Sequence, residues 1–200
     1  MKIKILLTVI IILSVCSISL ADHDCIEGIN EGTEINLEKK FPEDWLTIGG
    51  KLITDPKLHS ELSAKFKDYY YTGEDEGYTG HSFCAQKNGI YIKVHTGNSD
   101  VDTQSYAEFS AIPPKCYKCK RISKGTEYLT SKVGLKIGQS KATVSKVLNT
   151  IIKEDITTIS FEEILGDDKT SVKHTQKLRL VFQNSRLIDF EISDFREQDN

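Results

Sequence analysis

The feature that most constrains the fold is the hydrophobic pattern of residues 134–195, in which a helical period gives way to the period of strands. Ser140 can cap a helix that begins at Lys141, because its hydroxyl can accept a hydrogen bond from a free backbone N–H of the first turn. Apolar residues then follow at the spacing of one helix face, namely Val144, Val147, Leu148, Ile151 and Ile152. The pattern predicts an amphipathic helix with one face against a core.

Strand patterns follow this helix. Residues 156–161 are rich in β-branched side chains, which favour strands. Residues 178–182 and 188–192 each alternate apolar and polar side chains, and Asn184-Ser185 lies between them as a turn. Two alternating runs joined by a short turn predict a β-hairpin with one buried face. We expect that face to lie on the apolar stripe of the helix.

The first half of the chain has weaker patterns of the same kind. Asp55-Pro56 is typical of a helix start, because a capping residue precedes a proline at the first helical position. Asn88-Gly89 separates two runs of strand character and predicts a tight hairpin, since both residues tolerate positive φ. A further strand is expected over residues 106–112.

These patterns predict an α+β fold in which short helices pack on one or more antiparallel sheets and disulfides staple the structure. Residues 1–21 are expected to form a signal peptide. Residues 22–125 would form an N-terminal α+β region with the Asn-Gly hairpin, and residues 126–200 a C-terminal helix-plus-antiparallel-sheet unit. Because each half offers a short helix before its strands, two tandem helix-plus-sheet units are an alternative organisation.

The first residues indicate export. Lys2 and Lys4 precede an apolar run over residues 5–15, and small residues lead to Ala21, which is typical of a secretory signal peptide cleaved before Asp22. The run is too short for a stable membrane span, which needs about 20 apolar residues. We therefore expect a secreted or periplasmic protein, with a retained anchor or lipidation at Cys16 as alternatives.

Four cysteines remain once Cys16 leaves with the signal: Cys25, Cys84, Cys116 and Cys119. An even number in an exported chain predicts two disulfides, and three pairings are open. Cys116 and Cys119 also form a C-x-x-C pair flanked by basic residues, which could lower a thiol pKa for redox chemistry. A structural role is favoured, because thioredoxin-type pairs open a helix after an early strand and this pair lies in mid-chain.

Composition and missing motifs count against several classes of function. The formal net charge of −3 becomes −5 when Lys2 and Lys4 are removed (−3 − 2), so the chain lacks the basic surface that nucleic-acid binding requires. The five histidines match no zinc-ligand spacing, and no hydrolase signature is present. We therefore assign no catalytic residue, no metal ligand and no cofactor.

The segment 134–148, Gly-Leu-Lys-Ile-Gly-Gln-Ser followed by spaced valine and leucine, resembles a pattern of exported proteins. It is similar to the helix-plus-sheet unit of the β-lactamase inhibitory protein family and of the small lipoprotein subunit of the outer-membrane assembly machine. The resemblance covers about residues 134–195, although the Gly-Pro that often follows the helix is replaced here by Asn149-Thr150. It implies a small helix layer against an antiparallel sheet, and a protein that acts by binding other proteins.

A tyrosine group offers one hypothesis for a binding surface. Tyr69, Tyr70 and Tyr71 are consecutive, and Tyr78 follows beyond an acidic loop. Tyrosine is enriched at binding hot spots because it supplies a large contact area at little cost in entropy. The alternative is a structural role, since at least one of three consecutive strand residues must face inward.

The sequence therefore predicts an exported, non-catalytic module that binds or inhibits another protein. One alternative is an envelope enzyme, either a thiol oxidoreductase that uses Cys116 and Cys119 or a hydrolase whose residues form no known motif. Another is a membrane-anchored subunit of envelope assembly. No nucleic-acid partner is expected, nor a stable membrane span after cleavage of the signal.

Overall fold

The computed structural model describes residues 32–65, 70–75, 78–98, 103–114, 119–122, 131–166 and 171–198. All of them belong to one compact unit, Glu31–Asn200. A second unit, Met1–Asn30, contains the expected signal peptide and Cys25, which lie outside the described residues.

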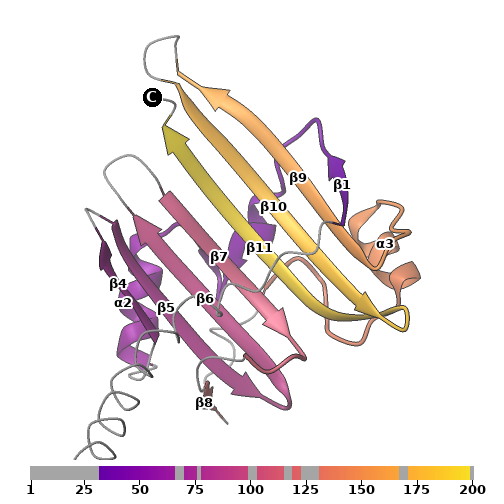
Figure 1. Ribbon diagram of the computed structural model, residues 1–200, viewed down its shortest axis with the longest axis horizontal. Helices are drawn as coiled ribbons and strands as arrows, with labels where there is room; N and C mark the ends of the chain where they lie inside the picture. The colour runs from indigo at the N-terminus through magenta and orange to yellow at the C-terminus, as the bar shows by residue number, and fades with distance from the viewer. Residues whose placement is uncertain are drawn as a thin grey trace, which may run out of the picture. The chain divides into compact units, whose positions relative to one another are not determined.

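A nine-stranded sheet dominates the described part of the chain (Figure 1). Its order is β1 (Thr33–Asn36), β9 (Ile156–Leu165), β10 (Val172–Gln183), β11 (Arg186–Gln198), β7 (Thr103–Ser110), β6 (Ile90–Asn98), β5 (Tyr78–Lys87) and β4 (Tyr70–Asp75), and β8 (Lys120–Arg121) also pairs with β5. Neighbours are antiparallel except for the pairs β1–β9 and β5–β8. The remaining elements are η1 (Glu43–Leu46), β2 (Thr47–Ile48), β3 (Lys51–Leu52), α2 (Pro56–Lys65) and α3 (Lys141–Leu148).

The predicted α+β class, with short helices packed on antiparallel sheets as one unit or two, is wrong, because the protein is mostly β. Strands of both halves join in one sheet, since β11 pairs with β7 over residues 189–196. The expected boundary between residues 125 and 126 lies outside the described residues.

The helix α3 shows why the helix layer fails. It begins at Lys141 as predicted, and Ser140 Oγ accepts a hydrogen bond from the Thr143 N–H at 3.2 Å. It ends after eight residues, because Asn149 adopts the left-handed conformation with φ of 51°. Only two side chains of the helix are buried, so it is too short to cover a large sheet.

The apolar stripe predicted for this helix is correspondingly broken. Val144 and Leu148 are buried, but Val147 is 39% exposed. Ile151, which lies beyond the helix end, is 77% exposed. The stripe of five apolar residues therefore predicted a helix that is too long and a buried face that is too wide.

The predicted local signals elsewhere are confirmed. Asn88 and Gly89, with φ of 51° and 79°, connect β5 to β6, and Asn184 and Ser185, with φ of 51° and 57°, connect β10 to β11. Positive φ at both central residues matches the right-handed twist of the flanking strands. The helix α2 begins directly after Asp55, whose Oδ1 accepts a hydrogen bond from the backbone N–H of residue 57 at 2.8 Å.

One face of the sheet is apolar and forms the core. Register places two rows of apolar side chains across β10, β11, β7, β6 and β5: Leu178, Ile192, Ala107, Val94 and Phe83, then Leu180, Phe190, Phe109, Ile92 and Ala85. All ten are buried in a cluster that also contains Phe41, Leu46, Ile48, Ile53, Leu58 and Leu62. Each large side chain buried in this way stabilises the fold by about 1.5–3 kcal/mol. The segment of η1, β2, β3 and α2 therefore packs on this face, behind the sheet in Figure 1.

The expected disulfide staple is confirmed for one pair. Cys84 on β5 is bonded to Cys119, which directly precedes β8, with their Cα atoms 4.7 Å apart. Cys119 is therefore not joined to Cys116, so the C-x-x-C motif does not form its own disulfide. Cys25 and Cys116 lie outside the described residues.

Candidate functional site

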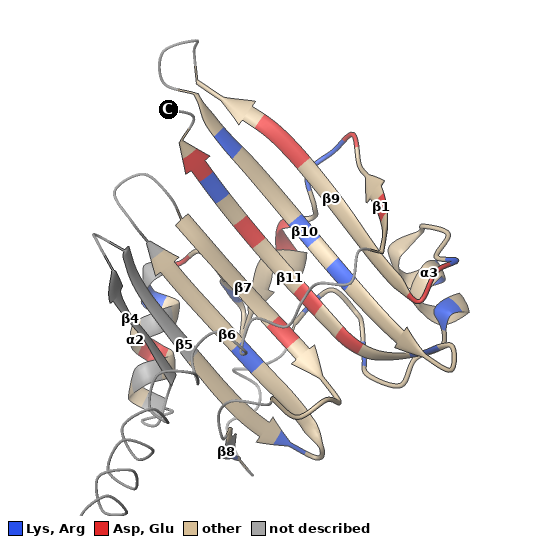
Figure 2. Cartoon of the chain, viewed as in Figure 1, with Lys and Arg blue, Asp and Glu red and all other residues tan. Residues whose placement is uncertain are grey.

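Charged side chains gather on β9, β10 and β11, where acidic residues on β9 and β11 flank basic residues on β10 (Figure 2). They form two clusters on opposite faces of the sheet, because side chains alternate between faces along a strand. The outer edge of β9 lies beside one of these clusters. These three features are described in turn.

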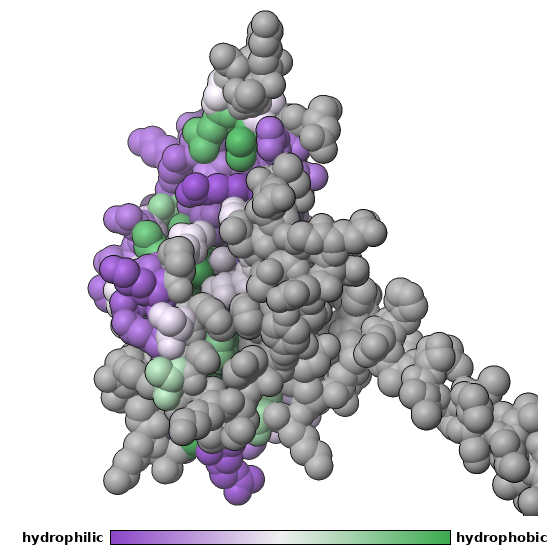
Figure 3. All heavy atoms as spheres, turned by 90° about the vertical axis from the view of Figure 1, so that its left-hand side faces the viewer, coloured by the Kyte–Doolittle hydropathy of each residue, from purple (hydrophilic) through white to green (hydrophobic). Residues whose placement is uncertain are grey.

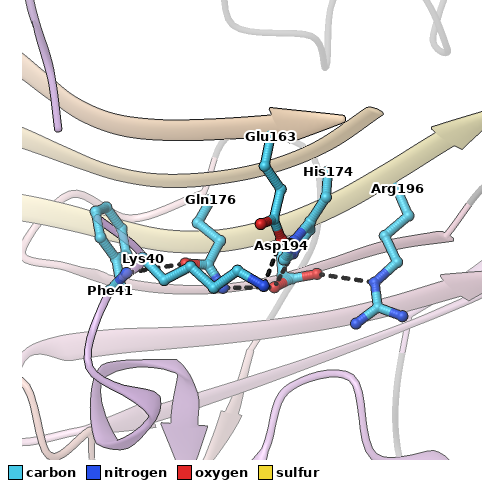
Figure 4. Close-up of polar contacts among 7 residues, drawn as sticks. All are labelled: Lys40, Phe41, Glu163, His174, Gln176, Asp194 and Arg196. Atoms are coloured by element: carbon cyan, nitrogen blue, oxygen red, sulfur yellow. Dashed lines mark hydrogen bonds and ion pairs between the residues drawn. The ribbon is translucent and has the colours of Figure 1, made fainter. Parts of the chain in front are cut away.

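The first cluster is centred on a buried histidine (Figure 4). His174 on β10 has its Nδ1 2.8 Å from Glu163 Oε1 on β9 and its Nε2 3.0 Å from Asp194 Oδ2 on β11. The side chains of His174 and Asp194 are 5% and 4% exposed. Strand register produces this geometry, since His174 lies opposite Glu163 and one step diagonally from Asp194.

Two further residues tie the chain after β1 to the same cluster. Gln176 Nε2 donates to Asp194 Oδ2 at 3.2 Å, and its Oε1 accepts the backbone N–H of Phe41 at 3.0 Å. Lys40 Nζ lies 2.5 Å from Glu163 Oε1. We name Lys40, Glu163, His174, Gln176 and Asp194 the His174 cluster.

The His174 cluster is suited to holding the fold together rather than to catalysis. The hydrogen bond from His174, with a further contribution from Lys40, lowers the pKa of Glu163 below its usual value. Both imidazole nitrogens of His174 are engaged, so neither is free to take a proton from a substrate. The cluster therefore positions the chain after β1 on the sheet.

The second cluster lies on the opposite, polar face. Register aligns Arg179, Glu191, Glu108 and Lys93 in one row across β10, β11, β7 and β6. Lys93 Nζ forms an ion pair with Glu108 Oε2 at 2.7 Å. Glu191 thus has a cation on one neighbouring strand and a carboxylate on the other.

Asp189 adds a third carboxylate on this face. It is 5% exposed, its Oδ1 has no hydrogen-bond partner among the described residues, and Arg179 Nη1 is 3.6 Å away. Burial, followed by the negative charge of Glu108, raises the pKa of Asp189 to about 7 and that of Glu191 to about 7. We name Glu108, Asp189 and Glu191 the acidic row.

The outer edge of β9 is covered along only its first half. β1 pairs in parallel with residues 157–160, and the Leu37 N–H donates to the Ser160 carbonyl at 2.7 Å. Among the described residues no strand pairs with β9 on this side beyond Ser160. Two large apolar side chains are exposed there, Ile164 by 70% and Leu165 by 40%. We name Glu162–Leu165 the open edge.

The predicted tyrosine surface falls at the other edge of the sheet. Tyr70 and Tyr71 belong to β4, the last strand on that side, and Tyr78 begins β5. Tyr69 lies outside the described residues, and so do the side chains of the other three tyrosines. The interface hypothesis therefore stays a prediction. Viewed from the β4 side, the described surface is mainly hydrophilic with separate hydrophobic spots (Figure 3).

Sequence reasoning missed both carboxylate clusters. A usable signal existed in the alternation itself, because Gln176 and Asp194 occupy the same face as the neighbouring apolar Leu178 and Ile192. A polar residue at a core-facing position needs a buried partner. The sequence pattern does not show which strands supply those partners.

Comparison with known proteins gives no identification. No family model matches the chain, and neither the curated proteins nor the solved structures gave a match. Within the described ranges, no group of three or more His, Cys, Asp or Glu side chains could hold a metal ion. The helices described are all too short or too polar to cross a membrane.

Proposed function

We propose that this protein is an exported, non-catalytic module that binds or inhibits another protein, and that the open edge is its docking surface. The observation that carries the proposal is the exposure of Ile164 and Leu165 beside a strand edge that β1 leaves uncovered. An exposed strand edge is a template for pairing with another chain, and exposed apolar side chains add contact energy to such pairing.

Export is part of the same proposal. The Cys84–Cys119 disulfide fits an oxidising compartment, where such bonds persist. The signal-like residues 1–21 and the resemblance of residues 134–195 to units that bind other proteins support the same reading. The partner is expected to be a protein of the envelope or the extracellular space.

Site-specific photo-crosslinking tests the proposal. A photoreactive amino acid would replace Ile164 in the full chain, expressed and exported in its source cells. Asn184 is the matched control, because it is an exposed residue at the opposite end of the same sheet region. We expect a discrete cross-linked protein from position 164 and none from position 184. Cross-links that are missing at 164, or identical at both positions, would contradict the proposal.

A mass measurement tests export and the cysteines. The exported protein would be alkylated, then weighed intact before and after reduction. We expect a chain that starts at Asp22 and takes up no label until reduction, with Cys25 joined to Cys116 as the remaining pair. A label on Cys116 before reduction would instead restore the redox alternative.

A further inference from the structure

We infer that the occupant of the open edge is an extended segment of a second exported protein, which adds as a strand beside β9 and presents a basic and an apolar side chain, two residues apart, on the polar face of the sheet. This inference rests on the proposed function and specifies its partner. It follows from three properties of the edge: the direction of its backbone groups, the side chains on its polar face, and the charge of the chain.

The backbone groups at the open edge require a strand as their partner. The Leu37 N–H bonds to the Ser160 carbonyl, so Ser160 turns its backbone groups away from β10. Because the direction alternates along a strand, Glu162 and Ile164 also turn their N–H and C=O outward. Among the described residues these groups have no strand beside them. An extended segment would satisfy them by continuing the sheet past the end of β1.

The side chains define the pattern of that segment. Glu162 and Ile164 share the polar face of the sheet, since they are two residues apart. Ile164 is 70% exposed, and a β-branched or other apolar side chain beside it would remove both from water. Lys173 Nζ lies 3.4 Å from Glu162 Oε2, but both side chains are nearly half exposed, so the carboxylate can accept a second cation. The neighbour of Glu162 should therefore be lysine or arginine.

A second copy of this chain fits the edge less well than another protein. Antiparallel pairing of two open edges about Ile164 would join only residues 162–166 of each copy. So short a contact falls far below the about 1,600 Å² that stable interfaces bury. Both copies would also carry the same net charge of −3. A basic partner is attracted where a second acidic copy is repelled.

Binding of two synthetic peptides to the full-length protein tests the inference. One peptide repeats the four residues Lys-Thr-Val-Thr, so that lysine and valine follow each other on one face of the strand. In the other peptide glutamate replaces lysine, and fluorescence anisotropy measures the binding of both. We expect the lysine peptide to bind and the glutamate peptide not to bind. Glu162→Lys should reverse this preference. Equal binding of the two peptides, or no binding of either, would overturn the inference.

Ile164→Pro tests the strand geometry separately. Proline removes an N–H that points outward and leaves the ladder to β10 intact, which edge strands tolerate. We expect at least about a tenfold loss of affinity for the lysine peptide. Ile164→Thr, which keeps the N–H, should lose less. An unchanged thermal midpoint would show that both variants are folded, and equal affinities of the two variants would exclude strand addition.

The outcomes separate this inference from the proposed function. If position 164 cross-links a partner but neither peptide binds, the protein is a binding module whose partner is not a strand of this kind. If analytical ultracentrifugation shows a dimer that Ile164→Pro abolishes, the occupant is a second copy and the inference is wrong.

Discussion

The His174 cluster and the acidic row lie on opposite faces of the sheet and share strand β11, yet the buried aspartates of the two groups have different surroundings. Asp194 and Asp189 are both on β11 and both nearly fully buried. The Oδ1 atom of each has no hydrogen-bond partner among the described residues, and an arginine lies 3.6–3.9 Å from it. Asp194 Oδ2 accepts hydrogen bonds from His174 and Gln176, whereas Asp189 has the Glu108 carboxylate beside it as well as a hydrogen bond with Ser110. Burial alone therefore does not decide how a carboxylate is accommodated. The chemistry of the neighbouring strands decides it.

The largest effect should come from removing the centre of the first cluster. His174→Leu takes a hydrogen-bond partner from Glu163 and from the buried Asp194. We expect the free energy of unfolding to fall by about 3–5 kcal/mol in urea denaturation, because one member of a buried charge network loses its partner. His174→Gln can still donate one hydrogen bond and should lose less. If His174→Leu lowered the free energy of unfolding by less than about 1 kcal/mol, the hydrogen bonds of His174 would not stabilise Asp194 and the contrast with Asp189 would fail.

Stability should fall as pH rises from about 4 to 7. The folded pKa of Asp189 and Glu191 is about 7, against ordinary values of 3.8 and 4.5, so in this range the folded state holds protons that the unfolded state has released. The expected loss is about 2–4 kcal/mol, complete above pH 7. Glu163 acts in the opposite direction, because its lowered folded pKa gives stability that is lost as pH falls below its ordinary 4.5. Urea denaturation across this pH range should show its maximum near pH 4.5, and a maximum above neutral pH would contradict the account.

Asp189→Asn should convert the acidic row into a neutral site. We expect a gain of about 2 kcal/mol in the free energy of unfolding near pH 8 and almost none near pH 4, because the wild-type aspartate is already protonated in acid. Asp44→Asn is the control, since its side chain is 72% exposed. Equal gains at both pH values would show that the carboxylate charge is not responsible.

The smallest effect should come from the exposed end of the His174 cluster. Lys40 is 52% exposed, and its partner Glu163 keeps the hydrogen bond to His174 when the lysine is lost. Lys40→Met should therefore cost about 0.5 kcal/mol in the same urea experiment, as an exposed ion pair does. A loss as large as that of His174→Leu would show that the exposed Lys40, not the buried histidine, contributes most of the stability of the cluster.

Local structure was predictable from the sequence, because its causes lie within a few residues. The cap at Ser140 and the turns at Asn88-Gly89 and Asn184-Ser185 are set by side-chain chemistry and positive φ. The early end of α3 at Asn149 also had a local signal, since asparagine favours the left-handed position after a helix. The apolar stripe, which extends to Ile152, instead predicts a helix longer than the observed one.

The sheet and the candidate site depend on distant residues. The hydrogen bond from Phe41 to Gln176 spans 135 residues, and no periodicity within either segment points to the other. Nor does the alternation of β7 and β11 show that they are neighbours. The pairing between strands of the two halves, on which the acidic row depends, could therefore not be predicted from local pattern.

The parallel position of β1 has a consequence for how the chain folds. Asn36 and Ser160, which are paired in register, are separated by 124 residues, so β1 emerges from synthesis or export long before its neighbour exists. Contacts of such separation form late, because the long loop between them must close first. Between the synthesis of β9 and its pairing with β1, the entire outer edge of β9 is open, and β1 competes for this edge with any other extended chain. A partner that arrives before β1 would meet an edge about twice as long as the one in the folded protein, so the order of folding and binding sets how much of β9 is available.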